Sequence, residues 1–396
     1  MLPAVLFHAA QHCRVMNQAN DIRSLQIELR SICILGLLIL VGMSLFASLF
    51  TPFDLSLPWL LASSVLWLLV YLLTRPRLTL NRIDASVPLF AGLGWANRMT
   101  LARGWLIAAC GGCLAIPALL SEAAIVVWIA AAAYSIAAMF DRVDGFIARK
   151  SGRTSQLGAE LDTLFDALGL MVAPVLALLL GKIHWSYLLV SVAYYLFVAG
   201  IKIRQRKQLP VYPLAPSQLR RTLAGFQMGY VAVVLWPPFD ASVTVLAGVG
   251  FMLPLLIGFL VDWCVVSGRI NPFEPRQKAM FEYIKRATDT VLMPAARVLL
   301  TAAICFAWSA DPFTRTLDMP AATLVLVSVL MMAAGVAGRA GAMLLLMVLA
   351  WNTPIALSDP LFYLSLFMSI AILLLGCGRY SLWQHDDHWV NRQDGA

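Results

Sequence analysis

Charged residues are scarce in this chain. They make up 13% of its 396 residues, whereas hydrophobic residues make up 61%. Typical soluble domains carry about 25% charged residues, so this composition excludes an ordinary soluble protein. The mean hydropathy of +0.80 points the same way. We therefore expect a polytopic membrane protein.

A second cysteine pair is missing beside the motif Cys110-Gly-Gly-Cys113. A structural zinc site needs four ligands, and this pair lies inside an apolar stretch. We therefore interpret the seven cysteines as mostly small core residues. A convincing cleavable signal peptide is also missing, because the first long apolar run starts late and has no clear cleavage site.

A nucleic-acid module is missing as well, although the net charge is +8. The basic residues are spread over short segments between apolar stretches instead of forming one patch. Membrane topology and anionic lipid headgroups explain this distribution better than a nucleic-acid partner does. We therefore expect no nucleic acid among the partners.

Long apolar stretches recur along the whole sequence. At about 20 residues per membrane-spanning helix, they predict an all-α protein with roughly twelve transmembrane helices. The stretches lie near residues 31–52, 56–74, 104–120, 123–140, 158–180, 184–201, 223–239, 243–266, 288–308, 320–338, 340–356 and 360–377.

Four aspartates interrupt the apolar sequence between Phe140 and Leu168. On helices, residues three or four apart share one face, so two neighbouring helices would present four carboxylates to one point. The spacing is D-x-x-D-G-x-x-A-R-x8-G-x-x-x-D-x-x-x-D. Its residues are Asp141, Asp144, Gly145, Ala148, Arg149, Gly158, Asp162 and Asp166.

Carboxylates crowded at the edge of a membrane repel one another unless positive charge is supplied. Two divalent metal ions would supply it. Oxygen-only ligands select hard cations such as Mg2+, with Mn2+ as an alternative. Mg2+ usually keeps some of its waters and binds substrate phosphates. The acids therefore predict a phosphoryl-transfer site.

These eight positions resemble the signature of the CDP-alcohol phosphotransferase (CDP-alcohol phosphatidyltransferase) family of membrane enzymes. The segment from Asn97 to Arg103 is similar to the family's N-x-x-T-x-x-R segment, although Ala96 stands where many members have proline. The resemblance covers roughly residues 93–267. It implies a six-helix unit that joins a CDP-linked alcohol to a second alcohol and releases CMP, and family members are commonly homodimers.

The resemblance implies a role for each matched residue. Asp141, Asp144 and Asp162 would be metal ligands, while Asp166 would share a metal and accept the proton of the attacking hydroxyl. The residues implied in binding the CDP-alcohol are Asn97, Thr100, Gly145, Ala148, Arg149, Ser155 and Gly158. The planar fork of Arg149 suits phosphate oxygens, and a salt bridge to one of the acids is the alternative interpretation.

A second basic cluster flanks the predicted loop between the fourth and fifth helices of this unit. Family members that use phosphorylated acceptors place arginine or lysine in this part of the fold. Arg220 and Arg221 are therefore candidates for binding the acceptor, and a purely topological role is the alternative. The cluster consists of Lys202, Arg204, Arg206, Lys207, Arg220 and Arg221.

The resemblance also divides the chain into parts. The basic stretch from Arg75 to Arg82 is either an interfacial amphipathic helix or a plain loop. The C-terminal part weakly resembles DoxX-like four-helix proteins through Arg297 and the ending that starts at Gly378. The expected parts are a two-helix membrane segment (1–92), the transferase domain (93–267), a charged linker (268–287) and a region of about four helices (288–396).

Lysine and arginine placement predicts the orientation, because cytoplasmic loops carry the positive excess. If both termini are cytoplasmic, only Lys182 and Arg315 lie on the opposite side, and Arg297 lies within a span. This orientation puts the acids at the cytoplasmic mouth of the protein. We therefore expect a location in a bacterial-type inner membrane with the active site facing the cytoplasm.

The sequence thus predicts a Mg2+-dependent transferase of phospholipid biosynthesis whose partners are membrane lipids, a CDP-alcohol donor and an alcohol acceptor. CDP-diacylglycerol is the preferred donor, because the predicted site opens at the membrane boundary. Two alternatives stay open. The chain could be a CDP-aminoalcohol transferase with a lipid acceptor, or a non-catalytic membrane scaffold that retains the fold.

Overall fold

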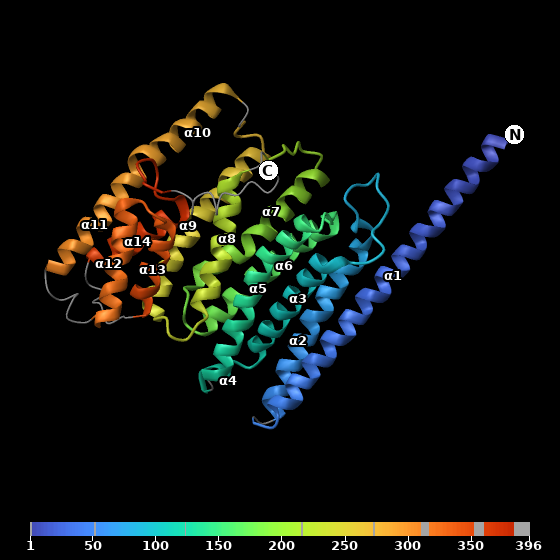
Figure 1. Cartoon of the computed structure of the whole chain (residues 1–396), viewed down its shortest axis with the longest axis horizontal. Coiled ribbons are helices and arrows are strands. Elements are labelled where there is room, and N and C mark those ends of the chain that lie inside the picture. Colours follow the sequence, from blue (N-terminus) through green and yellow to red (C-terminus); the bar gives the residue numbers. More distant parts are fainter. Residues whose placement is uncertain are drawn as a thin grey trace. The chain divides into compact units, whose positions relative to one another are not determined.

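The chain is all-helical in the computed structural model (Figure 1), as predicted. No strand occurs in the residues that the structure describes, and an isolated bridge joins Val336 to Trp383. The described ranges are 2–50, 53–122, 124–214, 217–271, 274–309, 317–351 and 360–383, with the side chains of 2–19, 53–55 and 121–122 excepted. Arg315, which entered the topology prediction, lies outside these ranges.

In the described residues, every apolar stretch predicted from the sequence overlaps a helix or a pair of helices. Within the described ranges the long spans number fewer than the predicted twelve, in part because three apolar helices near the C-terminus are shorter than a typical span of about 20 residues. The chain is nevertheless a polytopic membrane protein. In the described residues, 7 helices are long and apolar enough to cross a membrane: Asn20–Ala47, Ser56–Leu80, Ala124–Lys150, Gln156–Leu179, Trp185–Arg206, Ala241–Val266 and Pro275–Ser309.

The chain forms two compact units, residues 1–180 with 231–236 and residues 181–230 with 237–396. The first unit contains the acidic motif. Its α-helices are α1 (Leu2–Ala47), α2 (Phe53–Thr74), α3 (Gly94–Gly112), α4 (Pro117–Glu122), α5 (Ala124–Lys150) and α6 (Gln156–Leu179).

Helix α3 is central in the first unit, where it packs against α2, α5 and α6. Small residues allow the close approach to α2, since a Cβ on Gly112 would overlap the Ser63 hydroxyl. Leu101, Ile107 and Phe165 are fully or almost fully buried in the surrounding core. This packing directs one face of α3 toward the acidic ends of α5 and α6.

The segment between α2 and α3 is held beside the start of α3. Residues Arg75–Leu80 form a short 3-10 helix with Leu78 buried, which is neither an amphipathic α-helix nor a plain loop. The fully buried Asn81 donates hydrogen bonds to the carbonyls of Phe90 (3.4 Å) and Gly92 (3.0 Å). These bonds close the loop and fix the side chain of Asn81 next to α3.

The second unit contains the remaining α-helices. Residues 275–287, within the predicted charged linker, form a helix with no buried residue, which continues through the π-helical turn Thr288–Leu292 into the next helix. The helices are α7 (Leu188–Arg206), most of α8 (Gln218–Val234), α9 (Ala241–Val266), α10 (Pro275–Ala287), α11 (Met293–Ser309), α12 (Met319–Ala334), α13 (Gly338–Trp351) and α14 (Pro360–Leu375).

Two arginines are buried among the C-terminal helices. Arg297 on α11 is 6% exposed and Arg339 on α13 is 5% exposed. Both donate to backbone carbonyls at the carboxyl ends of helices, Arg297 to Met332 and Arg339 to Leu373 (2.8 Å each). Because the carboxyl end of a helix carries partial negative charge, it is a favourable environment for a guanidinium.

Candidate metal and phosphoryl-transfer site

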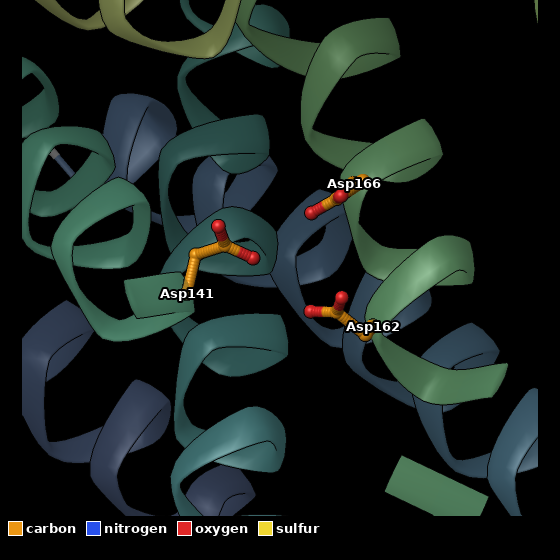
Figure 2. A group of neighbouring side chains, drawn as sticks. All are labelled: Asp141, Asp162 and Asp166. Atoms are coloured by element: carbon orange, nitrogen blue, oxygen red, sulfur yellow. The ribbon is translucent and has the colours of Figure 1, made fainter. Parts of the chain in front are cut away.

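Three of the four predicted aspartates meet in the first unit. Asp141 on α5 faces Asp162 and Asp166 on α6 (Figure 2), and one carboxylate oxygen of each lies within 4.8 Å of the others. All three side chains are partly exposed, at 26%, 46% and 36% respectively. The site can therefore be reached from outside the helix bundle.

A tight turn between α5 and α6 brings these acids together. Gly152 adopts a positive φ of 63° just after the end of α5, a conformation that glycine tolerates best. Ser155 then caps α6, because its hydroxyl accepts a hydrogen bond from the Gly158 amide (3.0 Å). Since α6 starts immediately after this turn, its first half, which carries Asp162 and Asp166, lies opposite the last turns of α5.

Asp144 has a different environment from the other three acids. It is 5% exposed and accepts a hydrogen bond from the Thr100 hydroxyl on α3 at 2.8 Å. The Thr100 hydroxyl is also within 3.1 Å of the Ala96 carbonyl. Thr100, which the resemblance assigned to donor binding, thus orients one of the acids in this structure.

Arg103 is the main site residue that sequence reasoning left without a role. This α3 side chain is 0% exposed, and its guanidinium contacts Asp141, Asp162 and Asp166. The one available signal was an arginine in an apolar helix, three residues after Thr100, within the N-x-x-T-x-x-R segment. Its spacing could not reveal which acids it would meet.

The predicted donor-binding residues Asn97, Ser155 and Gly158 form one network. The Asn97 amide donates to Asn81 (3.0 Å) and to the Ser155 hydroxyl (3.2 Å). A Cβ on residue 158 would stand 2.8 Å from Asn97 Oδ1, so glycine is needed for this close approach. Asn81 was not predicted, because an isolated asparagine in a loop gives no sequence signal.

The motif residues Gly145, Ala148 and Arg149 lie on the last two turns of α5. Arg149 is exposed, and its Nη1 lies 3.3 Å from the place of a Cβ on residue 145. Gly145 thus leaves room for the guanidinium to lie along the helix surface. Ala148 is partly buried, and its carbonyl accepts a hydrogen bond from the Arg153 amide (3.1 Å) in the turn.

The predicted acceptor residues Arg220 and Arg221 lie on α8 in the second unit. Arg220 forms an ion pair with Asp262 on α9, with its Nε 2.7 Å from the carboxylate. Arg221 is exposed. The ion pair anchors Arg220 to a specific neighbour, a contact that positive-inside topology alone does not require.

The three clustered aspartates suit a hard divalent cation, because they offer only oxygen donors from two helices. Within the described ranges, no other group of three or more histidine, cysteine, aspartate or glutamate side chains is placed to hold a metal. Cys110 and Cys113 are buried as free thiols in the first unit, consistent with a packing role.

Comparison with known proteins adds independent support. The family model described as CDP-alcohol phosphatidyltransferase matches residues 93–268. Comparisons with curated proteins and with solved structures find no match. The DoxX-like resemblance of the C-terminal region stays a prediction.

The matched family supplies the chemical class of the site. Its members are CDP-alcohol phosphotransferases, and they depend in general on divalent metals. Their substrates are a CDP-alcohol and a second alcohol. The matched residues include α3, the whole acidic motif and the clustered aspartates. Residues 93–268 therefore belong to the CDP-alcohol phosphatidyltransferase family, whose members are enzymes that transfer a phosphoalcohol group from a CDP-alcohol.

Proposed function

We propose that this chain transfers a phosphatidyl group from CDP-diacylglycerol to a second alcohol, releases CMP and requires Mg2+. The observation that carries the proposal is the convergence of Asp141, Asp162 and Asp166 from two helices. Such a set of acids beside a membrane is costly unless it has a function. The family match supports the reaction class.

The proposed reaction exchanges one phosphorus–oxygen bond for another. The acceptor's hydroxyl oxygen bonds to the phosphorus that carries diacylglycerol. The bond from that phosphorus to the bridging oxygen of the diphosphate breaks, and CMP leaves with the bridging oxygen. The hydroxyl proton passes to Asp166, which is 36% exposed and therefore accessible to an acceptor.

Several side chains would position the reactants. Mg2+ held by Asp141, Asp144, Asp162 and Asp166 would supply charge neutralisation at the diphosphate oxygens. The exposed guanidinium of Arg149 is suited to a phosphate group. The network of Asn97, Ser155 and Gly158 would hold the donor near the start of α6. Orientation of this kind can contribute roughly 7–11 kcal/mol toward lowering a barrier.

The choice of CDP-diacylglycerol rests on location. Asp162 and Asp166 lie in the first half of an apolar helix long enough to span a membrane, so a lipid-linked donor could present its diphosphate there without leaving the bilayer. The predicted orientation places this end at the cytoplasmic side of a bacterial-type inner membrane. A soluble CDP-aminoalcohol with a lipid acceptor would use the same acids, with the lipid on the acceptor instead of on the donor.

The proposed function is tested by CMP release from the detergent-solubilised protein. We expect CMP to form from CDP-diacylglycerol, Mg2+ and one member of a panel of alcohols, to stop with EDTA and to resume with excess Mg2+. CMP released only from a CDP-aminoalcohol with diacylglycerol would favour the aminoalcohol transferase. Folded protein that releases no CMP from any donor would favour the scaffold.

The proposed acceptor site gives a second prediction. Replacing Arg220 and Arg221 together by alanine should raise the acceptor KM by about tenfold or more, because a charge-assisted contact contributes on the order of 1.5–3 kcal/mol. The donor KM should stay nearly unchanged. The measurement is steady-state CMP release with each substrate varied in turn.

A matched control separates acceptor binding from the ion pair. Asp262→Asn removes the partner of Arg220 but keeps both arginines, so the acceptor KM should change far less than in the double variant. If the double variant leaves the acceptor KM unchanged, these arginines serve only topology and α8 packing.

A further inference from the structure

Arg103 is a fully buried cation whose hydrogen bonds, in the part of the chain that the structure describes, all go to the acidic cluster. The side chain is 0% exposed on α3, a helix that contributes none of the clustered acids. Its four hydrogen bonds go to residues of α5 and α6. A buried arginine of this kind requires partners to offset its loss of hydration, and the cluster provides them.

The guanidinium divides its donors among the acids. Nη1 donates to an oxygen of Asp141 and to Oδ1 of Asp162 (2.9 Å). Nη2 donates to Oδ1 of Asp166 (2.7 Å) and to the Asp162 backbone carbonyl (2.9 Å). The buried Nε has no hydrogen-bond partner among the described residues. The outer edge of the fork thus links α5 to α6 through their carboxylates.

These contacts have two electrostatic consequences. One guanidinium against three carboxylates stabilises the cluster but leaves it formally negative, so the cluster still attracts a cation. The guanidinium also donates to the same three carboxylates that form the candidate metal group. At such distances two unit charges interact strongly even at an effective dielectric constant of about 20. Arg103 must therefore weaken metal binding while it holds the ligands in place.

We propose that Arg103 is a positioning residue of the metal centre, a built-in counterion that holds Asp141, Asp162 and Asp166 together and competes with divalent ions for their oxygens. This inference rests on the proposed metal-dependent function. It explains why a cation contacts the same three acids that form the candidate metal group. Donation from two Nη atoms to three carboxylates at once requires the planar fork of arginine, which lysine lacks.

The proposal is tested by Mn2+ binding without substrate, measured by electron paramagnetic resonance on the full chain in detergent. We expect Arg103→Met, purified with Mg2+ to support folding, to bind Mn2+ at least about tenfold more tightly than the unaltered protein, because a nearby positive charge is gone. Its thermal stability should also depend more on Mg2+, with a larger rise in Tm between EDTA and saturating Mg2+.

Arg103→Lys keeps the positive charge. It keeps the proposal testable if Arg103→Met does not fold. A single ammonium cannot bridge all three carboxylates, so Mn2+ affinity should fall between those of the unaltered protein and Arg103→Met. Arg98→Met is the matched control. Arg98 is on the same helix and pairs with Glu28 (2.7 Å) instead of the cluster. It should leave Mn2+ affinity and the Mg2+-dependent rise in Tm unchanged.

Two outcomes would overturn the proposal, and they differ in whether they also rule out the proposed function. If the unaltered protein binds Mn2+ and both Arg103 variants bind it equally or more weakly, the counterion role is wrong but the proposed function stands. If the unaltered protein binds no divalent ion and releases CMP in EDTA, the metal requirement and the inference fail together.

Discussion

Asp166→Asn is expected to lower kcat for CMP release by about 10^3-fold, within the range of 10^2 to 10^4 typical of general-base catalysis. The amide preserves the size of the side chain but cannot accept a proton from the acceptor hydroxyl. Asp166 also provides one of the three clustered carboxylates and accepts a hydrogen bond from Arg103 (2.7 Å). A smaller part of the loss should therefore come from weaker metal binding.

The two contributions can be measured separately. Single-turnover CMP release at saturating Mg2+ reports the chemical step, and Mn2+ titration of the same variant reports the change in metal affinity. Glu160→Gln is a matched control on the same helix. Glu160 is 53% exposed and pairs with Arg77 (2.9 Å) outside the cluster, so its loss should change the rate little. Full activity of Asp166→Asn would eliminate the base assignment.

The local part of this site could be predicted from the sequence. Spacings of three and four residues on two helices, with a short turn between them, require the acids to approach one another at one end of the pair. The structure accordingly brings together Asp141, Asp162 and Asp166. The same regularity allowed the apolar stretches to be recognised as helices, because hydrophobic runs and helix geometry are both local properties.

The contacts made by α3 could not be predicted. Arg103 lies 38 residues from Asp141 and 63 from Asp166, so its partners depend on how three helices pack. Asp144 differs from its neighbours for the same reason, since only packing places Thr100 beside it. Spacing indicates which residues share a helix face but not which side chain of another helix faces them.

The C-terminal region shows a second limit of sequence reasoning. In the sequence, Arg297 is a charge within an apolar stretch, and the weak resemblance to DoxX-like proteins is its one interpretation. In the structure it donates hydrogen bonds to five acceptors at the ends of helices and in the chain after α14. These are the carbonyls of Met332, Ala333, Cys377 and Tyr380 and the hydroxyl of Ser381. Backbone partners of this kind leave no trace in a sequence.

Arg297→Met is accordingly expected to lower the free energy of unfolding by about 3 kcal/mol or more. The substitution keeps much of the apolar stem but removes a charged donor, and each buried acceptor left without its bond costs on the order of 1–3 kcal/mol. For a unit of about 200 residues, this corresponds to a fall in Tm of roughly 10 °C. The measurement is thermal unfolding of the full chain in detergent.

Two further variants test whether the loss of stability comes from the shape of the Arg297 guanidinium. Arg297→Lys should recover only part of the loss, because one ammonium cannot reach both the carboxyl end of α12 at Met332 and the chain after α14 at Tyr380. Arg286→Met is the control, since Arg286 is an exposed residue of α10 and its replacement should change Tm little. If Arg297→Met has the same Tm as the unaltered protein, water or neighbouring amides satisfy the carbonyls that Arg297 contacts equally well. The arginine then does not hold the C-terminal helices together.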